Sequence, residues 1–115
     1  MAAPIVFFDI AGPDNTALHR FYEQVFGWSI SAEGQFTVSA TSRLSAAIRQ
    51  DPPENRIYFG VEDVAKTLSA IEAAGGSVDA ARFEVPGVVI LGLFRDPAGN
   101  PMGLVEMASG QPKVP

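Results

Sequence analysis

The chain has 115 residues, of which 47% are hydrophobic and 18% charged, and it contains no cysteine. This composition is typical of one globular domain, which we place at residues 1–110, and it excludes disulfides, thiolate metal ligands and cysteine nucleophiles. The net charge of −5 makes nucleic acid and anionic membranes poor partners, because an acidic surface repels both. We expect no signal peptide and no membrane span, since the first apolar run is short and lacks a basic flank. We therefore predict a cytoplasmic protein.

The first half of the chain, residues 4–50, predicts a β-α-β-β-β module. A strand is expected at 5–10, and Asp14 is a suitable N-cap for a helix that ends at Gly27. Apolar residues recur along that helix at four-residue spacing, as Ala17/Leu18, Phe21/Tyr22 and Val25/Phe26. Three strand-like segments follow, at 28–32, 35–40 and 44–49, with a turn at 33–34.

The second half, residues 56–107, repeats this pattern after a linker at 51–55. A strand at 56–61 leads to a helix that Asp63 caps and that ends at Gly75 or Gly76. Strands are expected at 78–83, 88–94 and 102–107, with a strong turn at 96–100 between the last two. Residues 109–115 are expected to be a frayed tail.

The two helical stretches match in length, because Gly27 lies 13 positions after Asp14 and Gly76 lies 13 positions after Asp63. We therefore predict an α+β fold, in which two βαβββ modules form a curved mixed sheet with a central groove. One helix can cover only one face of each half-sheet. The other face must be buried by the other half, a second subunit or a ligand, so we expect a homodimer.

Strand alternation divides the side chains between the helix side and the groove. The rows Val6/Phe8/Ile10 and Ile57/Phe59/Val61 are uniformly apolar and should lie under the helices. The other rows place a mixed set in the groove, which we predict to bind a small-molecule ligand; its members are Phe7, Asp9, Arg56 and Tyr58, with Trp28 and Phe36 as aromatic walls. Two alternatives stay open: Asp9 and Arg56 could form a structural ion pair, and the rings could belong to the core.

Other catalytic patterns find little support. The single histidine, His19, falls on the polar side of the first helix and is expected at the surface, with Glu23 four residues on. No glycine-rich phosphate-binding spacing is present. Two carboxylate pairs, Glu62/Asp63 and Asp51/Glu54, do not look like acid/base pairs. The first starts a helix, where negative charge favours the helix dipole, and the second lies in the linker.

Several motifs in order resemble the vicinal-oxygen-chelate superfamily, which includes glyoxalase I, bleomycin-resistance proteins and extradiol dioxygenases. The residues that carry the resemblance are Phe8-Asp9-Ile10, Phe21-Tyr22 with Gly27-Trp28, Tyr58 to Val64, Gly75-Gly76, and Asp96 to Asn100 with Gly103-Leu104. Metal-dependent members hold a divalent ion with His and Glu side chains. The resemblance puts those positions at Phe7, at Ala46 or Ala47, at Arg56 and at Gly103, none of which offers a metal ligand. We therefore predict no metal and no cofactor.

Three hypotheses for the function remain. The first is a metal-free protein that binds a small, partly aromatic or apolar molecule, as the bleomycin-resistance proteins of this superfamily do. The second is an enzyme of lyase, isomerase or dioxygenase type, either metal-free with Asp9 as a base or using other metal ligands. The third is an interaction module whose groove is filled by its own side chains.

Overall fold

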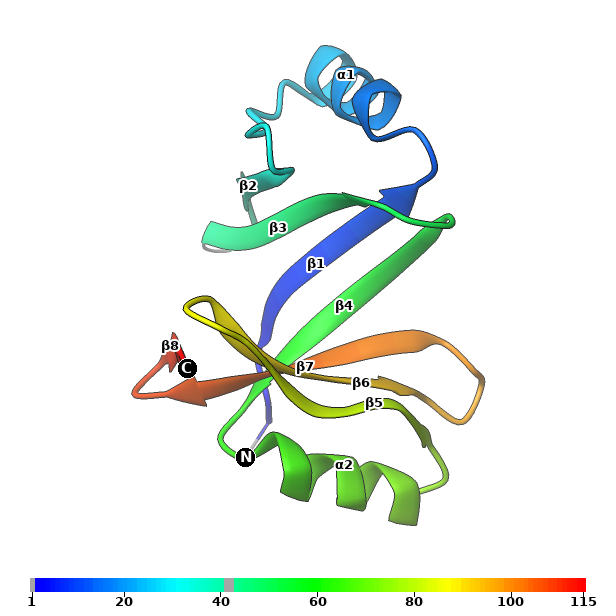
Figure 1. The fold of residues 1–115 in the computed structure, drawn as a ribbon, viewed down its shortest axis with the longest axis vertical. Helices are drawn as coiled ribbons and strands as arrows, with labels where there is room; N and C mark the ends of the chain where they lie inside the picture. Colours follow the sequence, from blue (N-terminus) through cyan, green and yellow to red (C-terminus); the bar gives the residue numbers. More distant parts are fainter. Residues whose placement is uncertain (1, 41–42) are drawn as a thin grey trace. The chain divides into compact units, whose positions relative to one another are not determined.

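The computed structural model describes residues 2–40 and 43–115, which form two α-helices and eight β-strands (Figure 1). The chain divides into two units. One comprises Phe7–Arg56, and the other comprises Ile57–Pro115 together with the N-terminal residues up to Val6. The mixed helix and strand content confirms the predicted α+β class. Among the described residues, no helix has the length and apolar character needed to cross a membrane.

The first unit builds its sheet around one central strand. It contains β1 (Ile5–Gly12), α1 (Asn15–Phe26), β2 (Gln35–Ser39) and β3 (Arg43–Gln50). β3 pairs with β1 in parallel and with β2 antiparallel, so the order is β2-β3-β1 (Figure 1). The parallel pair joins the first and last strands of the module.

The helix α1 has the predicted ends. The Asp14 carboxylate accepts a hydrogen bond from the Ala17 N–H at 3.0 Å, which satisfies one of the free donors of the first turn. Gly27 follows with φ of 70°, the left-handed conformation that glycine adopts without strain. Phe8 and Ile10 pack with Leu18 of α1 in one apolar cluster, which confirms that their row lies on the helix side of β1.

The strand predicted at 28–32 is wrong, because the described backbone there forms no strand. Trp28 and Ile30 are half-buried and pack against the core. The apolar residues at alternate positions therefore reflect burial of these side chains, without pairing of the backbone in a sheet. The segment then turns back on itself, where the Gln35 N–H donates to the Ser31 hydroxyl at 3.0 Å. The first module is therefore βαββ in this structure.

The second unit contains the full βαβββ succession. Its elements are β4 (Glu54–Val61), α2 (Val64–Ala73), β5 (Ser77–Val85), β6 (Val89–Arg95), β7 (Pro101–Ala108) and β8 (Gln111–Pro112), although the first residues of β4 belong to the other unit. β4 and β7 pair in parallel, while β7, β6 and β5 pair antiparallel in that order (Figure 1). As in the first unit, a parallel pair joins the first strand to a strand that follows the helix.

Local signals in this half also hold. Asp63 caps α2 by accepting from the Lys66 N–H at 2.9 Å. Asp96 forms the predicted turn, because its Oδ1 accepts from the N–H groups of Ala98 and Asn100 at 3.0 and 2.9 Å. The core of this unit is a cluster of buried apolar side chains: Val64, Leu68, Phe94 and Leu104.

The C-terminal segment differs from the expected frayed tail. β8 pairs with the end of β7, and the Lys113 N–H donates to the Glu106 carbonyl oxygen at 2.8 Å. The Lys113 ammonium also lies 3.3 Å from the Glu106 carboxylate. The buried acid Glu106, seven positions before Lys113, therefore holds this segment, which composition alone could not reveal.

Candidate functional site

Two charged side chains that the sequence places in the groove are deeply buried. Asp9 on β1 is 3% exposed, and Arg56 near the start of β4 is 6% exposed. Asp9 lies between Phe8 and Ile10 in the strand, so it points to the face of the β1–β3 pair away from α1. Charged groups are seldom buried without partners, so the contacts of this pair define the site.

Arg49 on β3 is the centre of these contacts. Its Nε lies 2.9 Å from Asp9 Oδ2, its Nη1 lies 2.9 Å from Asp51 Oδ2, and its Nη2 donates to Glu54 Oε2. Arg56 Nη2 donates to the other oxygen of Glu54 at 3.2 Å. These five residues, Asp9, Arg49, Asp51, Glu54 and Arg56, are called the charged cluster below, and all belong to the first unit.

The cluster stabilises the charged forms of its central members. Burial alone would lower the pKa of Arg49, but hydrogen bonds to Asp9, Glu54 and Asp51 outweigh it, and the pKa is raised. Burial alone would raise the pKa of Glu54, but the Arg49 hydrogen bond and the Arg56 charge outweigh it, and the pKa is lowered. Both groups are therefore charged throughout the physiological pH range, so the site presents fixed ionic groups.

The aromatic residues predicted for the groove are divided between different places. Phe36 is buried and stacks on Trp28 with ring centroids 5.0 Å apart, and Phe8 meets Phe36 edge to face at 5.9 Å. This aromatic cluster lies on the α1 side of the sheet, because Phe8 shares it, whereas Asp9 points the other way. The structure therefore does not bring Trp28 and Phe36 together with the charged cluster. Phe7 is half-buried and pairs in register with Ser45, in the row of Asp9.

Tyr58, the last predicted groove residue, belongs to the second unit and is 6% exposed. It pairs in register with Gly103 of β7. A Cβ atom built at Gly103 would collide with Cδ2 and Cε2 of the Tyr58 ring. The ring therefore fills the space into which a side chain at position 103 would project.

Two charged residues that carry much of this structure escaped the sequence reasoning. Arg49 could have been found by alternation, since Ala47 and Arg49 share a row on β3 and Ala47 pairs in register with Asp9. Glu106 on β7 is 4% exposed and accepts from Arg82 at 3.1 and 2.9 Å and from the Val64 N–H at 3.1 Å. No sequence pattern indicates the burial of Glu106, because Arg82 and Val64 lie 24 and 42 positions away.

A model of the glyoxalase-like domain matches residues 5–105. The chain belongs to the glyoxalase-like domain family. This confirms the predicted resemblance to the vicinal-oxygen-chelate superfamily, and it covers both units.

Among curated proteins, this glyoxalase-like domain is similar to the anthracycline biosynthesis protein DnrV of Streptomyces peucetius. The two are 30% identical over 118 residues, which cover 81% of this chain and 43% of the relative. Anthracycline biosynthesis protein DauV of Streptomyces sp. (strain C5) is 29% identical over 118 residues, which again cover 81% of this chain and 43% of the relative. The chain thus spans less than half the length of the curated relatives that it matches.

Among solved structures, a variant of Streptomyces coelicolor methylmalonyl-CoA epimerase superimposes with a TM-score of 0.67 at 19% identity, covering 98% of this chain and 100% of that one. Methylmalonyl-CoA epimerase from Mycobacterium tuberculosis gives a TM-score of 0.59 at 12% identity, covering 90% and 87%. At such identities the likeness establishes the fold alone.

A divalent metal does not fit the positions that the family resemblance indicates. The side chains of Phe7, Ala46 and Ala47 have no atom that can bind a metal ion. Arg56 is a buried cation, which would repel the ion, and the Tyr58 ring occupies the space above Gly103. Within residues 2–40 and 43–115, no group of three or more His, Asp or Glu side chains is arranged to hold a metal ion. The carboxylates of the charged cluster instead face the guanidinium of Arg49.

Proposed function

We propose that this glyoxalase-like domain binds a small, partly aromatic or apolar molecule without a metal, and that the charged cluster supplies the polar contacts. The observation that carries the proposal is the burial of Asp9 and Arg56 on strands whose equivalents hold the metal in metal-dependent relatives. Buried ionic groups cost stability compared with apolar residues of similar size. Their presence is explained if they orient a ligand.

The relatives suggest the chemical class of that ligand. The matched proteins are named for anthracycline biosynthesis, and anthracyclines are polycyclic aromatic compounds. An arginine guanidinium binds carboxylate and phenolate oxygens and also stacks on aromatic rings. We therefore propose a polycyclic aromatic compound with an acidic or carbonyl oxygen as the ligand class. The proposal also includes a cytoplasmic homodimer.

An enzyme with Asp9 as the catalytic base is the second candidate, because Asp9 is a buried carboxylate. Its Oδ2 accepts from Arg49 at 2.9 Å, and this bond would have to be exchanged before that oxygen could take a proton. The binding function requires no such exchange, so we favour it.

Calorimetric titration with anthraquinone-2-sulfonate, a water-soluble planar aromatic anion, tests the binding function. We expect saturable binding that is unchanged by EDTA and by added Ni²⁺, Zn²⁺ or Mn²⁺. Arg56→Ala removes a buried cation and should weaken binding of this anion by about tenfold or more. Circular dichroism checks that each variant is folded.

Arg95→Ala is the matched control, since it removes a surface arginine whose ion pair with Asp79 spans 3.1 Å in the second unit. Its affinity should equal that of the unchanged protein. An affinity of the Arg56 variant equal to that of the unchanged protein would disprove the role of the charged cluster. Binding that requires an added metal would overturn the metal-free proposal.

A further inference from the structure

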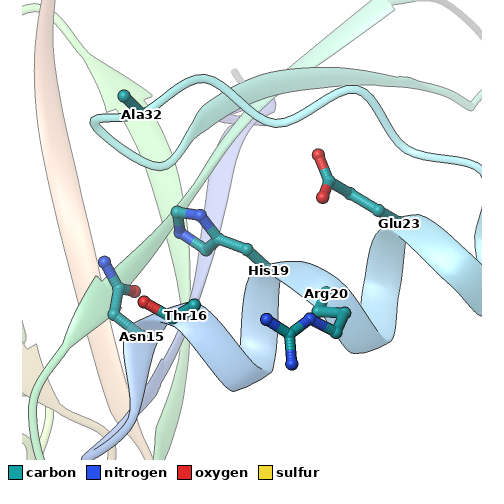
Figure 2. Close-up of a pocket in the computed structure, with 6 residues that line it drawn as sticks. All are labelled: Asn15, Thr16, His19, Arg20, Glu23 and Ala32. Carbon is teal, nitrogen blue, oxygen red and sulfur yellow. The ribbon is translucent and has the colours of Figure 1, made fainter.

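A pocket of about 400 Å³ lies along α1 in the first unit, and no residue of the charged cluster lines it. Figure 2 shows the residues that line this pocket. We call it the α1 pocket. It is lined by Asn15, Thr16, His19, Arg20 and Glu23 of the helix and by Ala32 of the following loop. His19 was expected at the surface. It is instead half-buried, and its ring extends from the helix toward the loop that carries Ala32 (Figure 2).

The polar groups of the α1 pocket have unused hydrogen-bonding capacity. Asn15 Oδ1 and His19 Nε2 are buried and have no hydrogen-bond partner within the described part of the chain. A buried polar atom left without a partner costs about 1–3 kcal/mol, so such atoms are uncommon in native proteins. Both side chains line the pocket, and a molecule bound there would supply the missing partners.

The charged groups of the pocket are likewise not used by the fold. A polar helix face usually forms pairs between residues three or four positions apart. Arg20 and Glu23 have this spacing, as do His19 and Glu23, yet neither pair forms an ion pair or hydrogen bond among residues 2–40 and 43–115. One cation and one carboxylate thus line the same pocket with both charges available.

We propose that the α1 pocket binds a small zwitterion of the α-amino-acid class with a polar side chain. Arg20 and the Thr16 hydroxyl lie four positions apart and bind the carboxylate, while Glu23 binds the ammonium group. His19 and Asn15 receive the polar side chain of the ligand. A simple anion would leave Glu23 facing it with like charge, and a simple cation would face Arg20, so a molecule with both charges is the best match.

An NMR titration of the ¹⁵N-labelled chain with L-glutamine tests the proposal, with acetate and methylammonium as the separate halves and L-leucine as the apolar control. We expect saturable shifts confined to the amides of residues 15–23 and 31–34. Glutamine should bind more tightly than either half and more tightly than leucine. Arg20→Gln and Glu23→Gln, both at exposed positions, should each weaken glutamine binding by about fivefold or more.

Three results would overturn the inference: no saturable shifts with glutamine, an equal response to acetate or methylammonium alone, or unchanged affinity in both variants. Lys66→Gln on α2 is the control, because it changes one exposed helical charge in the other unit. Asp9→Asn should leave glutamine binding unchanged. The outcome is therefore independent of the aromatic ligand assigned to the charged cluster.

Discussion

The ring of Tyr58 covers the backbone of Gly103, its register partner on the neighbouring strand. Gly103→Ala would place a methyl group where Cδ2 and Cε2 of the ring now lie. We expect this overpacking to lower the free energy of unfolding by about 1–3 kcal/mol, measured by urea denaturation. The loss should shrink in a Tyr58→Leu background, which makes room. Additive effects of the two substitutions would show that the close contact is not the cause.

Arg49 should matter more for stability than its exposed partner Asp51. Arg49→Ala leaves the buried Asp9 carboxylate without its 2.9 Å ion pair, and we expect a loss of about 3–5 kcal/mol. Asp51→Asn removes one surface contact and should cost less than about 1 kcal/mol. Urea denaturation of the two variants gives the comparison. Equal losses would mean that the burial of Asp9 is not what makes this cluster important.

Glu106 predicts a specific acid sensitivity. The hydrogen bonds from Arg82, helped by those from the Val64 N–H and Lys113, lower the pKa of Glu106 to about 2 from the usual 4.5. A carboxylate with a depressed pKa in the folded state stabilises the protein above about pH 4.5, and this contribution is lost as the pH falls toward 2.

Glu106→Gln removes that titration. The free energy of unfolding, followed by urea denaturation between pH 6 and pH 2, should therefore fall less steeply in the variant than in the unchanged protein. The variant should also be less stable at neutral pH, because Arg82 and Lys113 lose their ionic partner. Parallel curves for the two proteins would show that Glu106 titrates alike in the folded and unfolded states.

The predicted homodimer has a direct test in sedimentation equilibrium. Several large apolar side chains are exposed on the single chain, among them Phe21 and Val25 of α1 and Val88 after β5. Exposed apolar surface of this kind favours association. We expect a mass of twice the 12.2 kDa chain at micromolar concentrations. A mass of one chain at every concentration would exclude the dimer.

The local features of the fold could be predicted because their signals lie within a few residues. Asp14 and Asp63 cap the helices, and Asp96 forms its turn, as their positions before helical and turn sequences indicate. The apolar row Phe8/Ile10 also lies under its helix as expected. In each case the contacts of a side chain depend on its position within a helix, turn or strand, which the nearby sequence indicates.

The failures share a physical cause, which is that pairing between distant segments has no local signal. The alternation of Trp28 and Ile30 is real, yet no strand forms there. Arg49 reaches Asp9 across 40 positions because β1 and β3 pair in parallel. The sequence therefore indicated Asp9 and Arg56 as site residues, but not Arg49, which forms the ion pair with Asp9.

The division of the chain does not follow its sequence repeat. Pro4 accepts a hydrogen bond from the Gly60 N–H at 3.0 Å, and Val6 lies close to the same glycine, so the first residues belong with the second unit. A cut in the linker at 51–53 would thus give a C-terminal fragment that lacks a stretch of its own structure. Supplying residues 2–6 as a separate peptide should help that fragment to fold, whereas a bulky fusion at the N-terminus should disturb the second unit before the first.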